Sequence, residues 1–352
     1  MIRVLIVEDS PVVRELLAHI LGSDPGIQVA GTAENGEVGV EMAAQLAPDV
    51  ITMDIHMPIM DGYEATRRTM RDHPVPIVIV SASFDKKEVE GSFRAIEAGA
   101  LTIVRKPVGL GHPDHERMAR DLVRTVKLMS EVKVVRRWRR AEDGENLRVS
   151  PPPVPKPSGG IPRLEVVVIG ASTGGPVVVE SILSGIPRDF PVPILIVQHM
   201  ADGFSRGFVD WLNRTSNLQV CIAEENEPIL SGKVYLAPSG SQMILRPGGR
   251  ISYTKDAGEF GLCPSISHLF LSAARVYGAK ALAVLLTGMG RDGVAEMKIL
   301  RDMGAVTIAQ DKESSVVYGM PGEAVRIGAV THILSPDRIV KEIVRLTGNR
   351  NH

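Results

Sequence analysis

The 352-residue chain is poor in cysteine and has no long apolar run. Its two cysteines, Cys221 and Cys263, exclude a disulfide framework and are typical of a reducing compartment. The apolar runs are shorter than the roughly 18 residues that a membrane-spanning helix needs. The N-terminus enters a strand pattern directly, without the architecture of a signal peptide. We therefore expect a cytoplasmic protein without direct membrane insertion.

A strong charge of either sign is also missing. The formal net charge is −1, with 23% charged and 44% hydrophobic residues, which describes an ordinary soluble protein. Such a chain has no overall field that attracts a polyanion, so we expect no nucleic-acid partner. Its length predicts about two domains, because one domain usually takes roughly 150 residues.

Residues 127–161 are interpreted as an interdomain linker between domains at 1–126 and 162–348. From about Val132 to Pro162 the sequence is basic, then polar, then proline-rich, so it cannot bury a core of its own. Four arginines surround Trp138 in this stretch, at Arg136, Arg137, Arg139 and Arg140. A solvated linker helix explains them more simply than contact with an acidic partner or with the neighbouring domain.

The first domain alternates short apolar strands with helical patterns. Strand patterns occur at 3–7, 27–32, 49–55, 76–82 and 101–106, and helical patterns at 11–21, 37–46, 64–70, 87–98 and from 114 onward. Five such repeats with short connections predict an α/β domain whose parallel sheet is covered on both faces, in a flavodoxin-like strand order. Ser10 and Pro11 suit the cap and the first turn of the first helix.

Polar residues interrupt this domain where its strands end. They are Glu8, Asp9, Asp54, Ser81 and Lys106. Carboxylates gathered at one sheet edge favour a hard cation such as Mg²⁺, and a lysine and a hydroxyl nearby suit a phosphoryl group on one carboxylate. Each acid alone could simply cap a helix, but five such residues at four strand ends make coincidence a poor explanation.

The motifs VEDSPVVRELL, DVITMDIHMPIMDGYEA, VIVSAS and VRKP resemble the response-regulator receiver family over residues 1–126. The resemblance implies that Asp54 is the phosphoacceptor, that Ser81 senses the phosphoryl group and that Lys106 pairs with it. It also implies Mg²⁺ ligands, namely the carboxylates of Glu8, Asp9 and Asp54 and the backbone carbonyl of His56. The family usually carries an aromatic switch residue where this chain has Ile103, so the relay of the switch is expected to differ.

In the second domain a reactive serine follows an apolar strand. The turn Gly170-Ala171-Ser172-Thr173-Gly174 fits G-x-S-x-G, in which small neighbours expose a serine on a tight strand-to-helix turn. Pro176 suits the first turn of the following helix. A phosphate-binding turn is the rival interpretation, but Ser172 replaces the second glycine of G-x-G-x-x-G and no P-loop lysine follows.

A base and an acid complete a predicted triad. Among the histidines of this domain up to Gly348, which are His199, His268 and His332, only His199 directly follows a fully apolar strand. A serine needs such a base, because its unperturbed hydroxyl is a poor nucleophile. Asp292, in the glycine-rich segment LLTGMGRDG, can orient the imidazole, and it can also cap a helix from Gly293 to Met303. The order Ser, His, Asp differs from that of α/β-hydrolases.

IGASTGGP, VQHM, LLTGMGRDG and QDKESSVVYGMPGEA together resemble the catalytic domain of bacterial chemotaxis protein-glutamate methylesterases. The resemblance implies a doubly wound, mostly parallel α/β domain without a cofactor. It implies hydrolysis of glutamyl methyl esters on the cytoplasmic helices of chemoreceptors, deamidation of certain receptor glutamines, and a chemotaxis histidine kinase as phosphodonor. The implied roles are Ser172 as nucleophile, His199 as base, Asp292 as orienting acid, and the Met289 amide with Thr173 as oxyanion donors.

The second domain departs from the family pattern at two positions. The family commonly has an arginine and an aspartate where this chain has Cys263 and Ser267, so substrate contacts are expected to differ. We hypothesise that the unphosphorylated first domain packs over the triad and that phosphorylation of Asp54 weakens this interface. The competing class of function is a phosphorylation-controlled binding adaptor with a vestigial hydrolase pocket.

Overall fold

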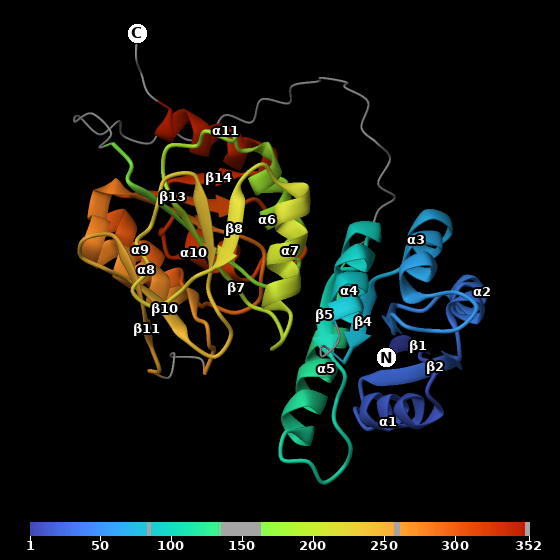
Figure 1. Ribbon diagram of the computed structural model, residues 1–352. Helices are drawn as coiled ribbons and strands as arrows, with labels where there is room; N and C mark the ends of the chain where they lie inside the picture. Colours follow the sequence, from blue (N-terminus) through green and yellow to red (C-terminus); the bar gives the residue numbers. More distant parts are fainter. Residues whose placement is uncertain (83–85, 133, 135–162, 257–260, 349–352) are drawn as a thin grey trace.

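The computed structural model describes residues 1–82, 86–132, 134, 163–256 and 261–348. Figure 1 shows two lobes, one coloured blue to teal and the other green to red, with α4 and α7 facing each other between them. The predicted arginine cluster around Trp138 and most of the predicted linker lie outside the described residues. The domain boundaries at 1–126, 127–161 and 162–348 stay a prediction.

The N-terminal lobe is a five-stranded sheet flanked by five helices. All strand pairs are parallel and their order is β2-β1-β3-β4-β5, which confirms the predicted flavodoxin-like fold. Ser10 caps α1 by accepting from the Val13 amide, with Pro11 in the first turn, as predicted. The elements are β1 Ile2–Val7, α1 Pro11–Gly22, β2 Ile27–Ala33, α2 Gly36–Leu46, β3 Val50–Met53, α3 Gly62–Asp72, β4 Ile77–Ser81, α4 Lys86–Ala98, β5 Thr102–Arg105 and α5 His115–Ser130.

The C-terminal lobe is built on a seven-stranded sheet, again with only parallel pairs. Its order is β14-β13-β12-β6-β7-β9-β8, and a separate antiparallel pair joins β10 to β11. The elements are β6 Val166–Ala171, α6 Gly175–Gly185, β7 Ile194–Gln198, α7 Ser205–Thr215, β8 Gln219–Ile222, β9 Lys233–Leu236, β10 Gln242–Arg246, β11 Arg250–Thr254, α8 Ile266–Tyr277, η1 Gly278–Lys280, β12 Ala281–Leu285, α9 Val294–Asp302, β13 Val306–Gln310, α10 Met320–Arg326, β14 His332–Leu334 and α11 Pro336–Thr347.

The strand order of this sheet places a crevice at the end of β6. From β6 the chain passes to β7, then to the edge strand β8 and back to β9 between them, and later it runs from β12 through β13 to β14 on the other side of β6. In open parallel sheets ligands bind beyond the carboxyl ends of the strands at such a reversal of strand order. The central strands are buried on both faces, by α6, α7 and α11 on one side and by α8, α9 and α10 on the other. This confirms the predicted doubly wound, mostly parallel domain.

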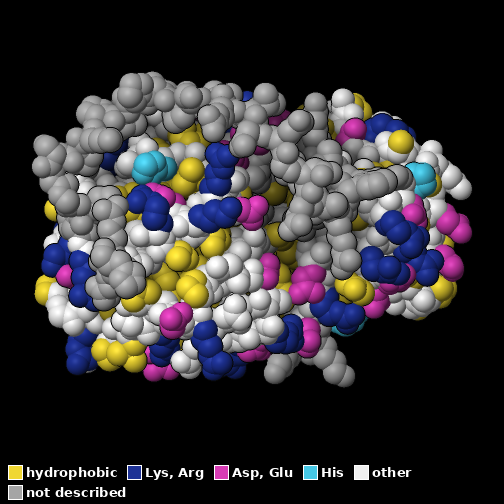
Figure 2. Space-filling model, turned by 90° about the horizontal axis from the view of Figure 1, so that it is seen from above, with side chains coloured by type: hydrophobic (Ala, Val, Ile, Leu, Met, Phe, Trp, Pro, Cys, Tyr) yellow, Lys and Arg dark blue, Asp and Glu magenta, His cyan; other side chains and the backbone are white. Residues whose placement is uncertain are grey.

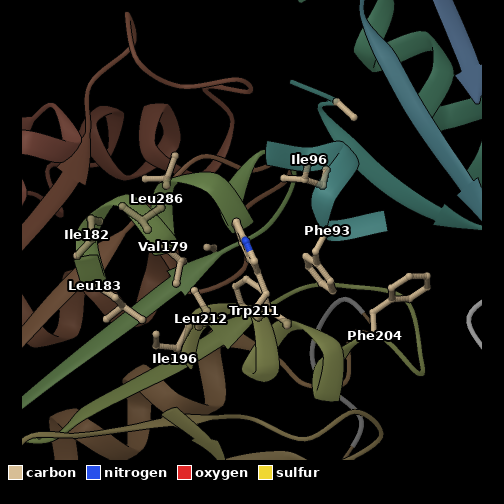
Figure 3. Packing of buried hydrophobic residues seen from close by; sticks show 14 of the residues in the cluster. Phe93, Ile96, Val179, Ile182, Leu183, Ile196, Phe204, Trp211, Leu212 and Leu286 are labelled. Atoms are coloured by element: carbon tan, nitrogen blue, oxygen red, sulfur yellow. The ribbon is translucent and has the colours of Figure 1, made fainter. Parts of the chain in front are cut away.

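The two lobes share a buried aromatic contact. Phe93 of α4 stacks on Phe208 and on Trp211 of α7, each with ring centroids 5.5 Å apart, and meets Phe204 edge-on at 6.5 Å. Figure 3 shows Phe93 reaching from the first lobe toward Trp211 and Phe204 of the second. All four rings are at most 2% exposed, so the apolar core continues across the junction between the lobes.

Polar contacts surround this aromatic cluster. The indole N–H of Trp211 donates to Glu97 Oε1, and Arg214 Nη1 lies 2.8 Å from Glu90 Oε1. On the face shown in Figure 2, Lys and Arg side chains are interspersed with Asp and Glu side chains over both lobes. No helix among the described residues is long and apolar enough to cross a membrane.

Candidate active site and phosphorylation site

The structure brings Ser172, His199 and Asp292 to the crevice beyond β6. Ser172 directly follows β6, His199 directly follows the neighbouring strand β7, and Asp292 lies in the segment between β12 and α9. Backbone hydrogen bonds join these segments, from the His199 amide to Ala171 O at 2.9 Å and from the Ser172 amide to Thr287 O at 3.0 Å. Residues 27 to 120 positions apart in the chain therefore meet at one rim because their strands are adjacent.

The imidazole of His199 is oriented by Asp292. His199 Nε2 lies 2.9 Å from Asp292 Oδ2, and Asp292 is 2% exposed. An ionised carboxylate only accepts hydrogen bonds, so Nε2 carries the proton and the neutral ring presents a free lone pair at Nδ1. The nitrogen available as a base is therefore Nδ1. Ser172 and His199 line the same cavity, but no hydrogen bond joins Ser172 Oγ to the ring among the described residues.

Asp292 also caps a helix, but not the predicted one. The sequence-based alternative had it capping a helix from Gly293 to Met303, whereas α9 begins at Val294 and has no side-chain cap. Its carboxylate instead accepts from the first amides of α8, Ile266 N at 2.6 Å and Ser267 N at 3.1 Å, and from Ser265 Oγ at 2.7 Å. The prediction was wrong because the side chain turns toward α8, whose N-terminus favours a negative charge.

These partners keep Asp292 ionised although it is buried. Burial alone raises the pKa of the carboxyl, but the hydrogen bond and charge of His199 outweigh it, helped by Ser265 and the Ile266 amide. The resulting pKa is about 2, against an ordinary value of 3.8. At neutral pH the acid is therefore a fixed negative charge beside the imidazole, which stabilises the protonated ring.

Two backbone amides close to Ser172 have no acceptor among the residues that the structure describes. Among the described residues, neither the Thr173 nor the Met289 backbone N–H makes a hydrogen bond. Both are near Ser172, because Thr173 is its neighbour in the chain and Met289 follows Gly288, whose added Cβ would lie 2.5 Å from Ser172 Cβ. Unoccupied amides beside a serine are suited to receive a negatively charged oxygen.

Thr287 fixes the two segments that carry these amides. Its hydroxyl donates to Thr173 O at 2.9 Å and accepts from the Val317 amide at 2.9 Å. Its own amide donates to Gln310 Oε1 at 2.8 Å. Thr287 is fully buried, so this network holds the loop before Met289 against the turn that contains Ser172.

The space in front of the serine is almost closed by the N-terminal lobe. The cavity that contains Ser172 and His199 measures about 30 Å³ and is also lined by Phe93, Thr102 and Ile103. Such a volume holds a water or two. Larger cavities of about 510 and 670 Å³ lie elsewhere along the junction, and neither is lined by Ser172 or His199. The site is therefore occluded by α4 and β5 in this structure.

A second polar cluster lies at the carboxyl ends of β1 and β3. Lys106 Nζ lies 2.9 Å from Asp54 Oδ2 and 3.0 Å from Glu8 Oε2. Carboxylate oxygens of Glu8, Asp9 and Asp54 lie within 4.8 Å of one another. Burial and then repulsion by Asp54 raise the pKa of Glu8 to about 7, although Lys106 opposes this. Burial likewise raises the pKa of Asp54.

This cluster fits a divalent cation. Three carboxylates supply the oxygen ligands that Mg²⁺ prefers. Burial is the main cause of the raised pKa of Glu8, and repulsion by Asp54, the second cause, is one that a bound cation would relieve. Ser81 is buried at the end of β4, and its backbone carbonyl accepts from the Lys106 amide at 2.8 Å. The role of the His56 carbonyl stays a prediction, as do the roles of the other predicted site residues.

Comparison with known proteins identifies both lobes. The family model of the CheB methylesterase matches residues 167–343, and that of the response regulator receiver domain matches residues 4–112. The chain belongs to the CheB methylesterase family. It is 53% identical over 356 residues to protein-glutamate methylesterase/protein-glutamine glutaminase 1 of Syntrophus aciditrophicus, covering 99% of both chains. It is 54% identical over 351 residues to the methylesterase/glutaminase of Nitrosospira multiformis, covering 99% of this chain and 98% of the relative.

A solved structure agrees with the C-terminal fold. The CheB methylesterase catalytic domain of Thermotoga maritima is 35% identical and superposes with a TM-score of 0.51, covering 52% of this chain and 98% of that one. The recognition of a receiver domain followed by a methylesterase domain is thereby confirmed. The two lobes are called the receiver domain and the methylesterase domain below.

The residues at which this chain differs from the usual family pattern can be located in the structure. Ile103, where an aromatic residue is usual, lines the cavity in front of Ser172. Ser267 contacts the segment that carries Asp292, because its amide donates to the Asp292 carboxylate and its hydroxyl accepts from the Gly293 amide at 2.9 Å. Cys263 is exposed. Of the other histidines, His268 lies in α8 and His332 in β14.

Sequence reasoning missed the residues that hold the predicted triad in place. Ser265 and Thr287 act through hydrogen bonds to partners far away in the chain, which no local pattern reveals. Gln198 did leave a signal, because it is a polar residue at the end of an otherwise apolar strand, directly before His199.

Proposed function

We propose that the chain is a phosphorylation-activated hydrolase of the cytoplasm. It removes methyl groups from glutamyl methyl esters on the cytoplasmic helices of chemoreceptors, with deamidation of receptor glutamines as a second reaction of the same site. Both reactions appear in the names of the relatives, protein-glutamate methylesterase/protein-glutamine glutaminase. The observation that carries the proposal is the pairing of His199 with the buried Asp292 at 2.9 Å, with His199 and Ser172 lining one cavity.

In the first half-reaction Ser172 Oγ attacks the ester carbonyl while His199 Nδ1 takes its proton. Asp292, kept ionised mainly by His199 and also by Ser265 and the Ile266 amide, stabilises the imidazolium that forms. The Thr173 and Met289 amides receive the negative charge on the carbonyl oxygen. The tetrahedral intermediate then expels the methoxy group, which takes the proton from His199 and leaves as methanol.

In the second half-reaction a water molecule hydrolyses the acyl-enzyme. His199 takes a proton from the water, the hydroxide adds to the acyl carbon, and Ser172 leaves with the proton returned by the ring. The product is a free glutamate side chain. With a glutamine substrate the first leaving group is ammonia, and the remaining steps are the same.

The receiver domain would control access to this site. We propose Asp54 as the phosphoacceptor, a chemotaxis histidine kinase as the phosphodonor, and Lys106 and Ser81 as partners of the phosphoryl group. Glu8, Asp9 and Asp54, with the His56 carbonyl, would hold Mg²⁺, which neutralises phosphoryl and carboxylate oxygens when bound. Lys106 now pairs with Asp54 and Glu8, so a phosphoryl group on Asp54 would draw it into new contacts.

The consequence of phosphorylation follows from the occlusion of the cavity. Phe93 and Ile103 cover a space of about 30 Å³, too small for a glutamyl ester, so the receiver domain must move before substrate enters. We propose that phosphorylation of Asp54 weakens the contact between α4 and α7 and exposes Ser172. The outcome in the cell would be sensory adaptation of the chemoreceptors.

Release of methanol from methylated receptor membranes tests the proposal. We expect the wild-type chain to release methanol faster with acetyl phosphate and Mg²⁺, and Asp54→Asn to lose this response. Ser172→Ala should reduce the rate by about 10⁶-fold. The matched control, Ser184→Ala on α6, removes a hydroxyl that bonds only within its own helix and should keep the wild-type rate. Receptor binding without methanol release would favour the adaptor hypothesis and refute this one.

A further inference from the structure

Gln198 joins the two segments that carry the proposed nucleophile and base. It is the last residue of β7 and is 3% exposed. Its Nε2 donates to the backbone carbonyl of Ser172 and to that of His199, both at 2.8 Å. A primary amide has two N–H groups, so both are used on these two carbonyls.

The location of this contact explains what it adds. The ladder between β6 and β7 ends at the pair Ala171 and Gln198, and the His199 amide still donates to Ala171 O. Beyond that point the two segments enter different loops, and no further backbone hydrogen bond joins them among the described residues. The Gln198 amide therefore supplies a cross-link one residue past the end of the sheet, at the position where Ser172 and His199 stand.

The carbonyl oxygen of the Gln198 side chain shows that packing alone does not explain why a glutamine occupies this position. Gln198 Oε1 is buried and has no hydrogen-bond partner among the described residues. An unpartnered buried carbonyl is unfavourable, and an apolar side chain of similar length would avoid it. The oxygen also occupies the space above Gly175, where an added Cβ would lie 2.1 Å from it. The amide N–H groups are thus the feature that only glutamine provides here.

We propose that Gln198 is a positioning residue of the triad, which fixes the distance and angle between Ser172 Oγ and His199 Nδ1. This inference rests on the proposed function, because it requires these two groups to react together. It predicts that Gln198 acts on the chemical step and not on substrate binding.

The main test is Gln198→Met in the full-length chain treated with acetyl phosphate and Mg²⁺. Methionine keeps the length but donates no hydrogen bond. The rate of methanol release is divided by the number of reactive Ser172 side chains, which a fluorophosphonate label counts. We expect the resulting kcat to fall by about 10²-fold, the loss expected when two reacting groups are misplaced by about 1 Å. KM should stay within about twofold, since no substrate contact changes. The unfolding midpoint should shift by less than about 5 °C.

A second variant disrupts the same contact by a steric clash. Gly175→Ala places a methyl group where Gln198 Oε1 lies, so it should displace the amide and lower kcat although neither catalytic side chain is altered. Because both changes disrupt one contact, the double variant should be no slower than the slower single variant. The matched control is Ile343→Ala in α11, a buried residue outside the site, which should lower the midpoint and leave kcat unchanged.

The outcomes separate this inference from the function on which it rests. A wild-type chain that releases no methanol, or a Ser172→Ala variant as active as wild type, would overturn both. The inference alone would be overturned if wild type is active and Ser172→Ala is inactive, but Gln198→Met keeps the full kcat. A rise in KM without a fall in kcat, or effects of Gly175→Ala and Gln198→Met that multiply, would also overturn it.

Discussion

Truncation of Phe93 should make the methylesterase site accessible to substrate without phosphorylation. Phe93 is 1% exposed and stacks on Phe208 and Trp211 across the domain junction. Replacing such a ring by alanine in a packed core costs about 3–5 kcal/mol. Phe93 also packs within the receiver domain, so we assign one half to two thirds of the lower value, roughly 1.5–2 kcal/mol, to the interface. Because about 1.4 kcal/mol is a factor of ten, basal activity should rise by about 10–30-fold.

The assay is methanol release by unphosphorylated Phe93→Ala, compared with unphosphorylated wild type and with the maximal rate after phosphorylation. This maximal rate should not change, since Phe93 belongs to the receiver domain and not to the triad. The control is Arg214→Ala, which removes an ion pair to Glu90 whose side chains are 50% and 46% exposed. Such pairs contribute about 0–1 kcal/mol, so this variant should gain less than about fivefold. A folded Phe93→Ala with wild-type basal activity would refute the occlusion argument.

Three further outcomes are expected. Asp292→Asn should lower kcat by about 10⁴-fold, since an amide cannot accept from His199, Ser265 and the α8 amides together; kcat within tenfold of wild type would contradict its orienting role. Because the pKa of Asp292 is lowered to about 2, its ionisation stabilises the fold above pH 3.8 and this contribution is lost as the pH falls through about 2; acid unfolding of Asp292→Asn should lack that step. Protons compete with Mg²⁺ for Glu8, whose pKa is about 7, so Mg²⁺ affinity measured by calorimetry should rise from pH 6 to pH 8; a flat profile would contradict the assignment of Glu8 as a ligand.

The fold was largely predictable from sequence because the signals are local. Apolar strands of four to six residues alternate with helical patterns, and parallel sheets bury both faces of such strands. The Ser10 cap and the prolines at helix starts marked the helix boundaries correctly. Strand order in the methylesterase domain was less accessible, because the reversal at β6 depends on packing between distant segments.

The candidate site was predicted as a set of side chains but not as a geometry. Ser172 and His199 could be found because each follows an apolar strand directly. The choice of Nε2 for Asp292, and hence of Nδ1 as the base nitrogen, depends on how the imidazole is turned, which a linear pattern does not encode. The capping role of Asp292 was misjudged for the same reason, since α8 reaches it from a segment 25 residues earlier in the chain.

The most direct test of the account is the modification of Ser172 by a fluorophosphonate in the full-length chain, located by peptide mass spectrometry. We expect a single adduct, on the peptide that contains Ser172, formed faster after treatment with acetyl phosphate and Mg²⁺ and absent from Ser172→Ala. An adduct on another residue in an active enzyme would contradict the proposed nucleophile. An equal rate with and without the phosphodonor would contradict its control by the receiver domain.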